Sequence, residues 1–291
     1  MKLSEIFKAR RPVLSFEVFP PKPDLPIDSV FQAISALKDF SPSFISVTYG
    51  AGGSSRTRTV EIASRIKQDF CLEPMAHLTC VGHTKIDVDK ILAELEDKGL
   101  VNILALRGDP PRDQPNFDYN KGEFKFAIDL IRYIRLKKPN FSIAAAAYPE
   151  GHKACPRIRT DWEHLKDKVD AGVDLLITQL FYDNRLFYHF LETVRNMGIN
   201  CPIVPGIMPV FHAKQIKRIL SLCGASMPPE ILIMLDKYEN NPDDLKKAGV
   251  EYAIKQINDL LDNGVDGIHL EPMNKPELAA DILKDLRHRF C

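Results

Sequence analysis

Glu17 is the residue of this sequence with the clearest potential for acid–base chemistry. It lies in the apolar run 13–21, whose composition and two closing prolines mark it as a strand. Burial disfavours the charged form of a carboxyl group, so the pKa of such a glutamate can rise far above its ordinary value. A glutamate that stays protonated near neutral pH can act as a general acid. The alternative is a structural role, in which Glu17 caps a loop or pairs with a distant arginine.

Other apolar runs also end in side chains that can bind ligands or transfer protons. These residues follow strand candidates along the whole chain: Thr48, Tyr49, His77, Arg107, Asp109, Tyr148, Glu150, His152, Thr178, Gln179, Tyr182, Asp183, His269 and Glu271. The opposite ends of these runs carry Ser, Pro and Asn turns, and this asymmetry favours an enzyme. Simpler explanations exist for single residues. His77 can be a core histidine. Arg107 and Asp109 can form a structural ion pair. Tyr148 and Tyr182 can simply cover the end of the barrel core.

The periodicity of apolar residues predicts alternating strands and helices. Eight strand candidates begin near Val13, Phe44, Pro74, Asn102, Ser142, Leu175, Ile203 and Gly267. Helical patterns fill the intervals, over 29–40, 59–70, 87–98, 124–137, 161–171, 185–197, 213–223 and 276–289, with two more over 229–237 and 243–263. Eight βα units in 291 residues predict an α/β fold, the (β/α)8 TIM barrel. Catalytic groups of such barrels gather at the carboxyl ends of the strands.

We expect one domain over residues 1–291, with a short N-terminal surface helix over about 1–11. The extra helices lie between the seventh and eighth strands, over about 224–263. An open doubly wound sheet is the alternative fold. A sheet of that kind that binds a dinucleotide normally has a glycine-rich first turn. Here the segment 50–55 does not complete GxGxxG, and no GxxxxGK[ST] motif occurs.

Charge and cysteine usage narrow the class of protein. Lys plus Arg and Asp plus Glu both number 39, so no overall positive field would attract nucleic acid or an anionic membrane. No apolar run approaches the roughly 18 residues that a membrane span needs. The six cysteines form no CxxC pair, and none has a histidine at metal-ligand spacing. We therefore expect reduced thiols, no metal and a cytoplasmic location.

Three kinds of barrel chemistry can be weighed. A Schiff-base aldolase needs a lysine that projects into the barrel, and no strand end carries one. A metal-dependent hydrolase needs His and carboxylate ligands close together. No HxH or HExxH spacing supports such a site among His77, Asp109, Glu150 and His269. The remaining class is an organic cofactor that binds over the barrel mouth, with Glu17 as the acid.

Several segments at these strand ends match one known family in the same order. They cover most of the chain through Gln215 and are the runs 15–21 (SFEVFPP), 46–51 (SVTYGA), 77–80 (HLTC), 105–109 (ALRGD), 146–152 (AAYPEGH), 168–172 (KVDAG), 177–183 (ITQLFYD) and 205–210 (PGIMPV). The sequence thereby resembles the methylenetetrahydrofolate reductases, flavoenzymes that make methyltetrahydrofolate, and in particular the catalytic barrel of the bacterial type.

This resemblance implies that the barrel binds FAD noncovalently at the carboxyl ends of its strands. The implied FAD contacts are Thr48, Tyr49, Ala51, His77, Arg107, Gly108, Asp109, Ala127, Tyr148, His152, Asp161, His164 and Lys168. Glu17 and Asp109 would be the catalytic residues and would also contact the folate. The other implied contacts of the folate or the nicotinamide are Gln179, Gln215 and Lys275.

The implied reaction reduces 5,10-methylenetetrahydrofolate to 5-methyltetrahydrofolate, a step of one-carbon metabolism and methionine biosynthesis. NADH or NADPH would pass hydride to the flavin and leave, and the folate would then take its place. Glu17 would supply the proton that opens the bridged ring to an iminium cation, which the reduced flavin would then reduce. Asp109 as an anion would favour that cation and lower the flavin's reduction potential.

Two segments depart from the family pattern. Asp167 stands where bacterial relatives often carry an arginine near the FAD diphosphate, and Lys168, Arg157 or Arg159 are expected to compensate. The run 270–275 (LEPMNK) replaces the usual Phe-Tyr-Thr-Leu-Asn-Arg. Lys275 therefore stands for an arginine whose bidentate contacts a lysine cannot make.

These departures leave a second function open. The alternative is a flavin- and folate-binding subunit of a larger electron-transfer complex, which needs a partner protein to oxidise NAD(P)H. Another flavin barrel, such as a proline dehydrogenase, is a weaker alternative that Glu17 and the segment 178–179 argue against. We also expect the chain to form a homo-oligomer.

Overall fold

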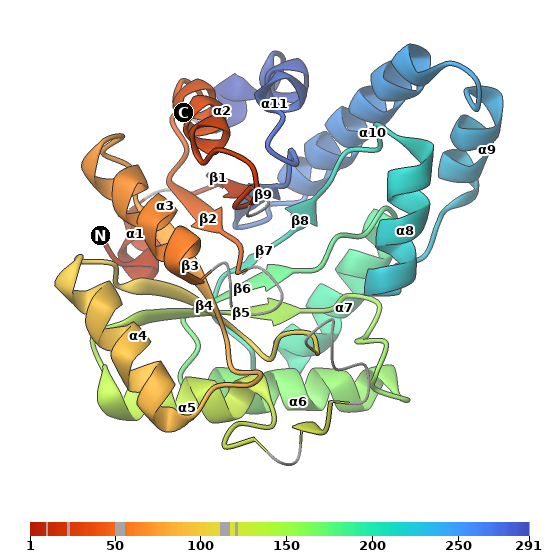
Figure 1. Ribbon diagram of the computed structural model, residues 1–291. Helices are drawn as coiled ribbons and strands as arrows, with labels where there is room; N and C mark the ends of the chain where they lie inside the picture. The colour runs from red at the N-terminus through yellow and green to blue at the C-terminus, as the bar shows by residue number, and fades with distance from the viewer. Residues whose placement is uncertain (10, 22–23, 50–55, 111–116, 120–121, 291) are drawn as a thin grey trace.

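The strands of the computed structural model surround a common axis, and the helices lie outside them (Figure 1). The structure describes residues 1–9, 11–21, 24–49, 56–110, 117–119 and 122–290. Within these residues, parallel strands follow the order β7-β6-β5-β4-β3-β2-β1-β9-β8 in a nearly closed barrel. The predicted (β/α)8 TIM barrel is therefore confirmed.

The observed elements follow the predicted alternation closely. The strands are β1 (Val13–Val18), β2 (Phe44–Val47), β3 (Pro74–Thr79), β4 (Asn102–Leu106), β5 (Ser142–Ala147), β6 (Leu175–Thr178), β7 (Ile203–Val204), β8 (Gly206–Ile207) and β9 (Gly267–Leu270). The helices are α1 (Leu3–Ala9), α2 (Asp28–Lys38), α3 (Arg56–Gln68), α4 (Lys85–Asp97), α5 (Ala127–Lys137), α6 (Ile158–Asp170), α7 (Asn184–Asn196), α8 (Ala213–Cys223), α9 (Pro229–Lys237), α10 (Pro242–Asp262) and α11 (Pro276–Leu283).

Local hydrogen bonds explain where several helices differ from their predicted bounds. α4 begins two residues early because the side chains of Thr84 and Asp87 cap its first turn reciprocally. α5 begins only at Ala127, where the Asp129 carboxylate accepts from the backbone N–H of Phe126 at 3.0 Å. The last predicted helix is also shorter, since a separate 3-10 turn forms its end over Arg287–Phe290.

The seventh predicted strand is divided at Pro205. Proline has no backbone N–H to donate to a ladder. β7 pairs with β6 on one side of this residue, and β8 pairs with β9 on the other. The Pro205 carbonyl still accepts a hydrogen bond from the His269 N–H at 2.9 Å. One continuous segment thus closes the barrel, and eight predicted strands become nine.

The N-terminal helix α1 has one exposed face and one buried face. Leu3, Ile6 and Phe7 of α1 are buried and pack with the inward residues at the amino ends of the strands. The spacing of these three residues puts them on one face of a helix. The charged residues of α1 lie on its other face, and the helix closes the amino end of the barrel.

Register decides which side chains of β1 enter the barrel. Leu14, Phe16 and Val18 belong to the apolar layer between strands and helices. Ser15 and Glu17 alternate with them and therefore point inward. Parallel pairing places Glu17 beside Ser46 of β2 and Ser15 beside His269 of β9.

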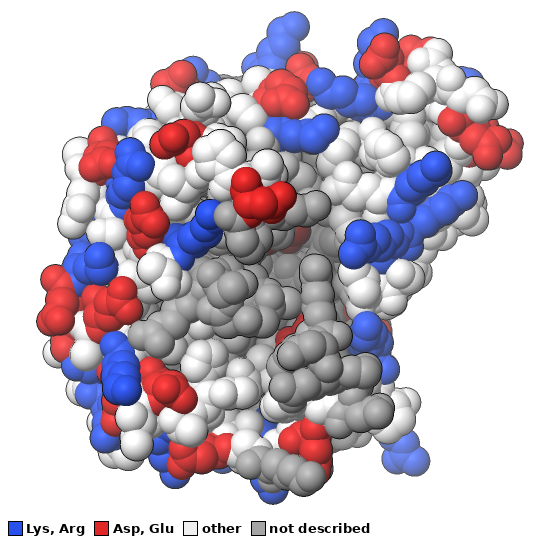
Figure 2. Space-filling view, viewed as in Figure 1, with Lys and Arg blue, Asp and Glu red and all other residues white. Residues whose placement is uncertain are grey.

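The surface shows no field of one sign on the face in Figure 2, where positive and negative side chains are interspersed. This agrees with the equal numbers of acidic and basic residues. In the part of the chain that the structure describes, no helix is both long and apolar enough to cross a membrane.

Candidate active site at the carboxyl ends of the strands

Glu17 lies inside the barrel mouth among neutral polar side chains. Its Oε2 atom accepts a hydrogen bond from Ser46 Oγ at 3.4 Å and lies 3.4 Å from His77 Nε2 and 3.7 Å from His269 Nε2. The Glu17 side chain is only 13% exposed. Among the described residues, no lysine or arginine pairs with it. The described residues therefore do not form the ion pair between Glu17 and an arginine that the sequence left open as an alternative.

Burial is the main cause of the shifted pKa values of Glu17, His77 and His269. It raises the pKa of Glu17 to about 7, and the Ser46 hydrogen bond opposes the rise. Burial also lowers the pKa of His77 to about 3 and that of His269 to about 4. Both imidazoles are therefore neutral near pH 7, and neither supplies a cation that would ionise Glu17. The site can hold a protonated carboxylic acid at neutral pH.

A second carboxyl lies in the same mouth. Glu271 directly follows β9, and burial, with the nearby charge of Glu17, raises its pKa to about 8. The sequence placed Glu271 at a strand end and noted it as a departure from the family, but did not predict a role for it. Its position two residues beyond the inward-facing His269 was the signal that could have found it.

A cavity of about 460 Å³ opens beside this mouth, over the ends of β4 and β5. Seven of the predicted FAD contacts line it: Arg107, Ala127, Tyr148, His152, Asp161, His164 and Lys168. Its floor is apolar, formed by residues that include Ala105, Leu106, Ile128 and Ala146. A cavity lined by apolar side chains together with a small number of polar groups is typical of a cofactor site.

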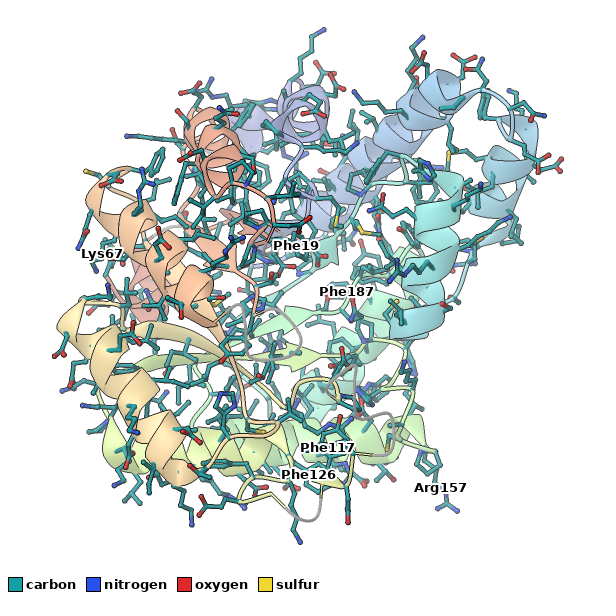
Figure 3. All side chains as sticks on the ribbon, viewed as in Figure 1. Phe19, Lys67, Phe117, Phe126, Arg157 and Phe187 are labelled. Carbon is teal, nitrogen blue, oxygen red and sulfur yellow. The ribbon has the colours of Figure 1, made fainter. Side chains whose placement is uncertain are left out.

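Lys168 is a cation that lines this cavity together with Arg107. Its Nζ donates a hydrogen bond to the Ala146 carbonyl at 2.8 Å, and burial lowers its pKa to about 8 although Asp161 acts in the opposite direction. Asp167 also lines the cavity, and the compensation of its charge by Lys168 stays a prediction. Arg157 and Arg159 are exposed and do not line the cavity. Figure 3 shows Arg157 extending away from the molecule.

The loops after β5 and β4 hold the polar rim in place. The His152 N–H donates to the Asp161 carboxylate at 3.1 Å, and the His152 ring meets Tyr148 edge-on at 4.8 Å. The Arg107 guanidinium lies 4.4 Å from the centre of the Tyr119 ring. Asp109 is exposed at the end of this loop.

Gly108 has to be glycine. Its φ is +86°, and a Cβ there would stand 2.7 Å from Val81 Cγ1 and 2.8 Å from Thr79 Cβ. The loop after β4 therefore turns sharply here and presses against the end of β3.

Three other predicted FAD contacts lie on or directly after β2 and β3. Thr48 and Tyr49 follow β2, and the Tyr49 hydroxyl lies 3.3 Å from His83 Nε2. His77 belongs to the Glu17 cluster rather than to the cavity lining. Ala51 falls outside the described residues.

The predicted substrate contacts are distributed around the rim. The Gln179 Oε1 accepts from the Leu180 N–H at 2.9 Å, and Gln215 lies in the first turn of α8. The Lys275 ammonium is 4.8 Å from the centre of the Phe211 ring. Asn274, which the sequence did not single out, donates to the Phe19 carbonyl and accepts from the Phe19 N–H, at 2.7 and 2.9 Å. It thereby fixes the loop that follows Glu17.

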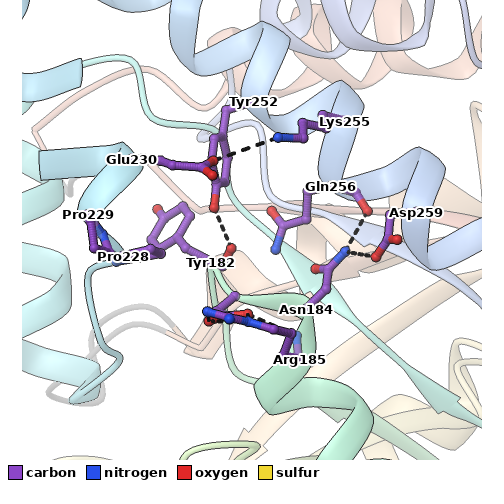
Figure 4. Close-up of a pocket in the computed structure, with 11 residues that line it drawn as sticks. Tyr182, Asn184, Arg185, Pro228, Pro229, Glu230, Tyr252, Lys255, Gln256 and Asp259 are labelled. Carbon is purple, nitrogen blue, oxygen red and sulfur yellow. Dashed lines mark hydrogen bonds and ion pairs between the residues drawn. The ribbon is translucent and has the colours of Figure 1, made fainter. Parts of the chain in front are cut away.

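A further cavity of about 420 Å³ lies between the start of α7 and the helices α9 and α10 (Figure 4). Six of its polar side chains pair with one another: Arg185 with Asp183, Lys255 with Glu230, and Asn184 with Asp259. Tyr182 and Asp183, two of the candidate residues at strand ends, line it, but among the described residues it includes no predicted catalytic, FAD or substrate contact. Among the described residues, no cluster of three or more His, Cys, Asp or Glu side chains is placed to hold a metal ion.

The donor set of the cavity over β4 and β5 fits FAD. The apolar floor suits a planar ring system, and the buried amine of Lys168 with Arg107 at the rim suits an anionic diphosphate. The assignment of each contact stays a prediction.

Comparison with known proteins gives the family. The family model for methylenetetrahydrofolate reductase matches residues 2–287. Methylenetetrahydrofolate reductase (NADH) 1 of Arabidopsis thaliana is 38% identical over 295 residues, which cover 98% of this chain and 50% of that protein. The 5,10-methylenetetrahydrofolate reductase of Pectobacterium carotovorum is 33% identical and is covered over 89% of its length.

The chain spans about half the length of the plant relatives that it matches. Among solved structures, a Clostridium thermocellum protein described as binding two copies of 5-methyl-5,6,7,8-tetrahydrofolic acid aligns with a TM-score of 0.67 at 14% identity, over 99% of both chains. At this identity the likeness concerns the fold alone. The family model and the relatives at 33–38% identity, by contrast, agree over nearly the whole sequence, and on their evidence the chain belongs to the methylenetetrahydrofolate reductase family.

Proposed function

We propose that this chain catalyses the FAD-dependent reduction of 5,10-methylenetetrahydrofolate to 5-methyltetrahydrofolate with electrons from NADH or NADPH. The observation that carries the proposal is Glu17, a buried carboxyl with a pKa near 7 and no cation beside it among the described residues. The relatives' names support the folate and a nicotinamide donor, and they include both NADH and NADPH forms.

FAD, when bound, supplies hydride transfer between the nicotinamide and the folate. The residues that would hold it line the cavity over β4 and β5. Lys168 and Arg107 would contact the diphosphate, while Tyr148 and His152 would shape the rim. Asp109, exposed at the loop end, would add negative charge near the reacting groups.

Glu17 would move the proton. It enters the reaction as a neutral acid because burial keeps Oε2 protonated near pH 7. Its O–H bond breaks as an amine nitrogen of the folate's methylene bridge takes the proton, and the C–N bond of the bridge opens to an iminium. The Ser46 hydroxyl then donates to the carboxylate that remains.

Anaerobic stopped-flow kinetics with Glu17→Gln test this assignment. The variant should keep its flavin and the reduction of that flavin by NADH or NADPH. Reoxidation by methylenetetrahydrofolate should fall by roughly 10²- to 10⁴-fold, the usual contribution of a general acid. Glu277→Gln, a change of an exposed carboxyl at the start of α11, is the control. Equal loss in both half-reactions, or a protein that binds no FAD, would contradict the proposal.

The second candidate is a flavin- and folate-binding subunit that receives electrons through a partner protein. Lys275 favours it, because its ammonium faces the Phe211 ring and cannot make an arginine's bidentate contacts. Flavin that is bleached by NAD(P)H only after a partner is added would support this candidate. We also propose a cytoplasmic homo-oligomer, which light scattering would test.

A further inference from the structure

Strand register places a second carboxyl beside Glu17. β1 and β9 pair in parallel, with Ser15 opposite His269 and Phe16 opposite Leu270. The next step of this register brings Glu17 opposite Glu271. Paired residues of neighbouring strands face the same side, as the 2.8 Å contact of Ser15 Oγ with His269 Nδ1 shows one layer below. Both carboxyls therefore enter the mouth from strands about 4.8 Å apart.

The surroundings of Glu271 keep its carboxyl away from cations. Its Oε1 atom lies 3.3 Å from where a Cβ on Gly206 would stand, so the group lies over β8. The titratable groups whose electrostatics involve Glu271 are Glu17, His269, Tyr182 and Cys223. Within the described part of the chain, no lysine or arginine forms an ion pair with Glu271.

We propose that Glu17 and Glu271 act as one coupled carboxyl pair, in which Glu271 retains its proton when Glu17 gives up its own, so that the barrel mouth carries a single negative charge when Glu17 is ionised. The inference rests on the proposed role of Glu17 as the acid. After Glu17 has protonated the folate, solvent at the barrel mouth returns a proton to the Glu17 carboxylate, while Glu271 keeps its own proton. Glu271 acts through Glu17 and is a positioning residue.

The energetics agree with this order. Burial raises the pKa of Glu271 to about 8, and the charge of ionised Glu17 adds to the rise, while His269 opposes it. Glu17, at about 7, therefore ionises first and makes its neighbour hold its proton more tightly.

Infrared titration of the purified protein tests the pair without folate. Exposed carboxyls are ionised above about pH 6, so a carboxylic C=O band that persists there reports buried acids. Two protons should be lost in the wild type, with midpoints near 7 and 8. Glu271→Gln should leave one step. Glu17→Gln should also leave one step, with its midpoint below about 8 because the neighbouring charge is gone.

Glu17→Gln and Glu271→Gln each test the pair independently. If one variant does not fold, the other still decides the test. Glu277→Gln should match the wild type. A remaining step that stays at about 8 in Glu17→Gln, or a wild type without protonated carboxyl above pH 6, would overturn the pair. These outcomes do not depend on folate turnover, so the pair can fail while the proposed reaction stands.

Discussion

Glu17→Gln is expected to stabilise the protein at alkaline pH relative to the wild type. The folded-state pKa of Glu17 is about 7, above the ordinary value of 4.5, so the folded chain binds this proton more tightly than the unfolded chain. The stabilisation from the protonated group is complete below about 4.5 and is lost as the pH rises through about 7. Glutamine keeps the shape of the protonated acid and has no proton to lose.

The size of the effect follows from the two pKa values. Their separation corresponds to about 3 kcal/mol at 1.36 kcal/mol per pH unit. The side chain is 13% exposed, so solvent screens little of this energy. Between pH 5 and pH 8 the free energy of unfolding of Glu17→Gln should therefore rise, relative to the wild type, by about 2–3 kcal/mol.

Urea unfolding at the two pH values measures this difference directly. Both proteins should carry the same amount of FAD, because a ligand that binds the folded state adds its own stabilisation. The exposed-carboxyl variant Glu277→Gln should follow the wild type at both pH values. A stability difference between Glu17→Gln and wild type that is the same at pH 5 and pH 8 would refute the buried, protonated state of Glu17.

Three further changes test the cofactor cavity and its loops. Asp109→Asn should raise the flavin's reduction potential and slow folate turnover, because a negative charge near the flavin disfavours added electron density; potentiometry would expose an unchanged potential. FAD should bind more weakly as the pH rises above about 8, where the Lys168 ammonium loses its charge, and fluorescence titration of Lys168→Met should show weaker binding without that dependence. Gly108→Ala should lower the free energy of unfolding by about 1–3 kcal/mol, because its φ is +86° and the Cβ would collide with Val81 and Thr79; a neutral effect in urea would contradict the strain.

The barrel could be predicted from the sequence because its elements depend on local patterns. Apolar runs and helical periodicity recur eight times, and each strand was placed near its observed start. The charges of α1 indicated its exposed face, but the surface that its apolar face covers could not be predicted. Leu3, Ile6 and Phe7 lie on one helical face, and only the assembled strand ends show what that face covers.

The site was predictable only in part, because its electrostatics depend on contacts between distant strands. The apolar run around Glu17 indicated burial, and the structure agrees. Among the described residues, Glu17 has neutral neighbours from β2, β3 and β9 and no lysine or arginine partner. Local sequence patterns cannot show which strands meet at Glu17. For the same reason the pairing of Glu271 with Glu17 needed the observed register. Arg157 was expected near the diphosphate from its position in sequence, yet its side chain points outward.

The closed amino end of the barrel constrains the kinetics of the proposed reaction. Leu3, Ile6 and Phe7 are at most 5% exposed, and Asn102 ties α1 to the strands by accepting from the Leu3 N–H at 3.0 Å. Within the described part of the chain, small molecules therefore reach Glu17 from the carboxyl ends of the strands. A nicotinamide and a folate that exchange hydride at this end compete for one approach, so the first must leave before the second binds. Initial rates should give parallel double-reciprocal lines, as ping-pong kinetics require, and intersecting lines would show that both substrates bind together.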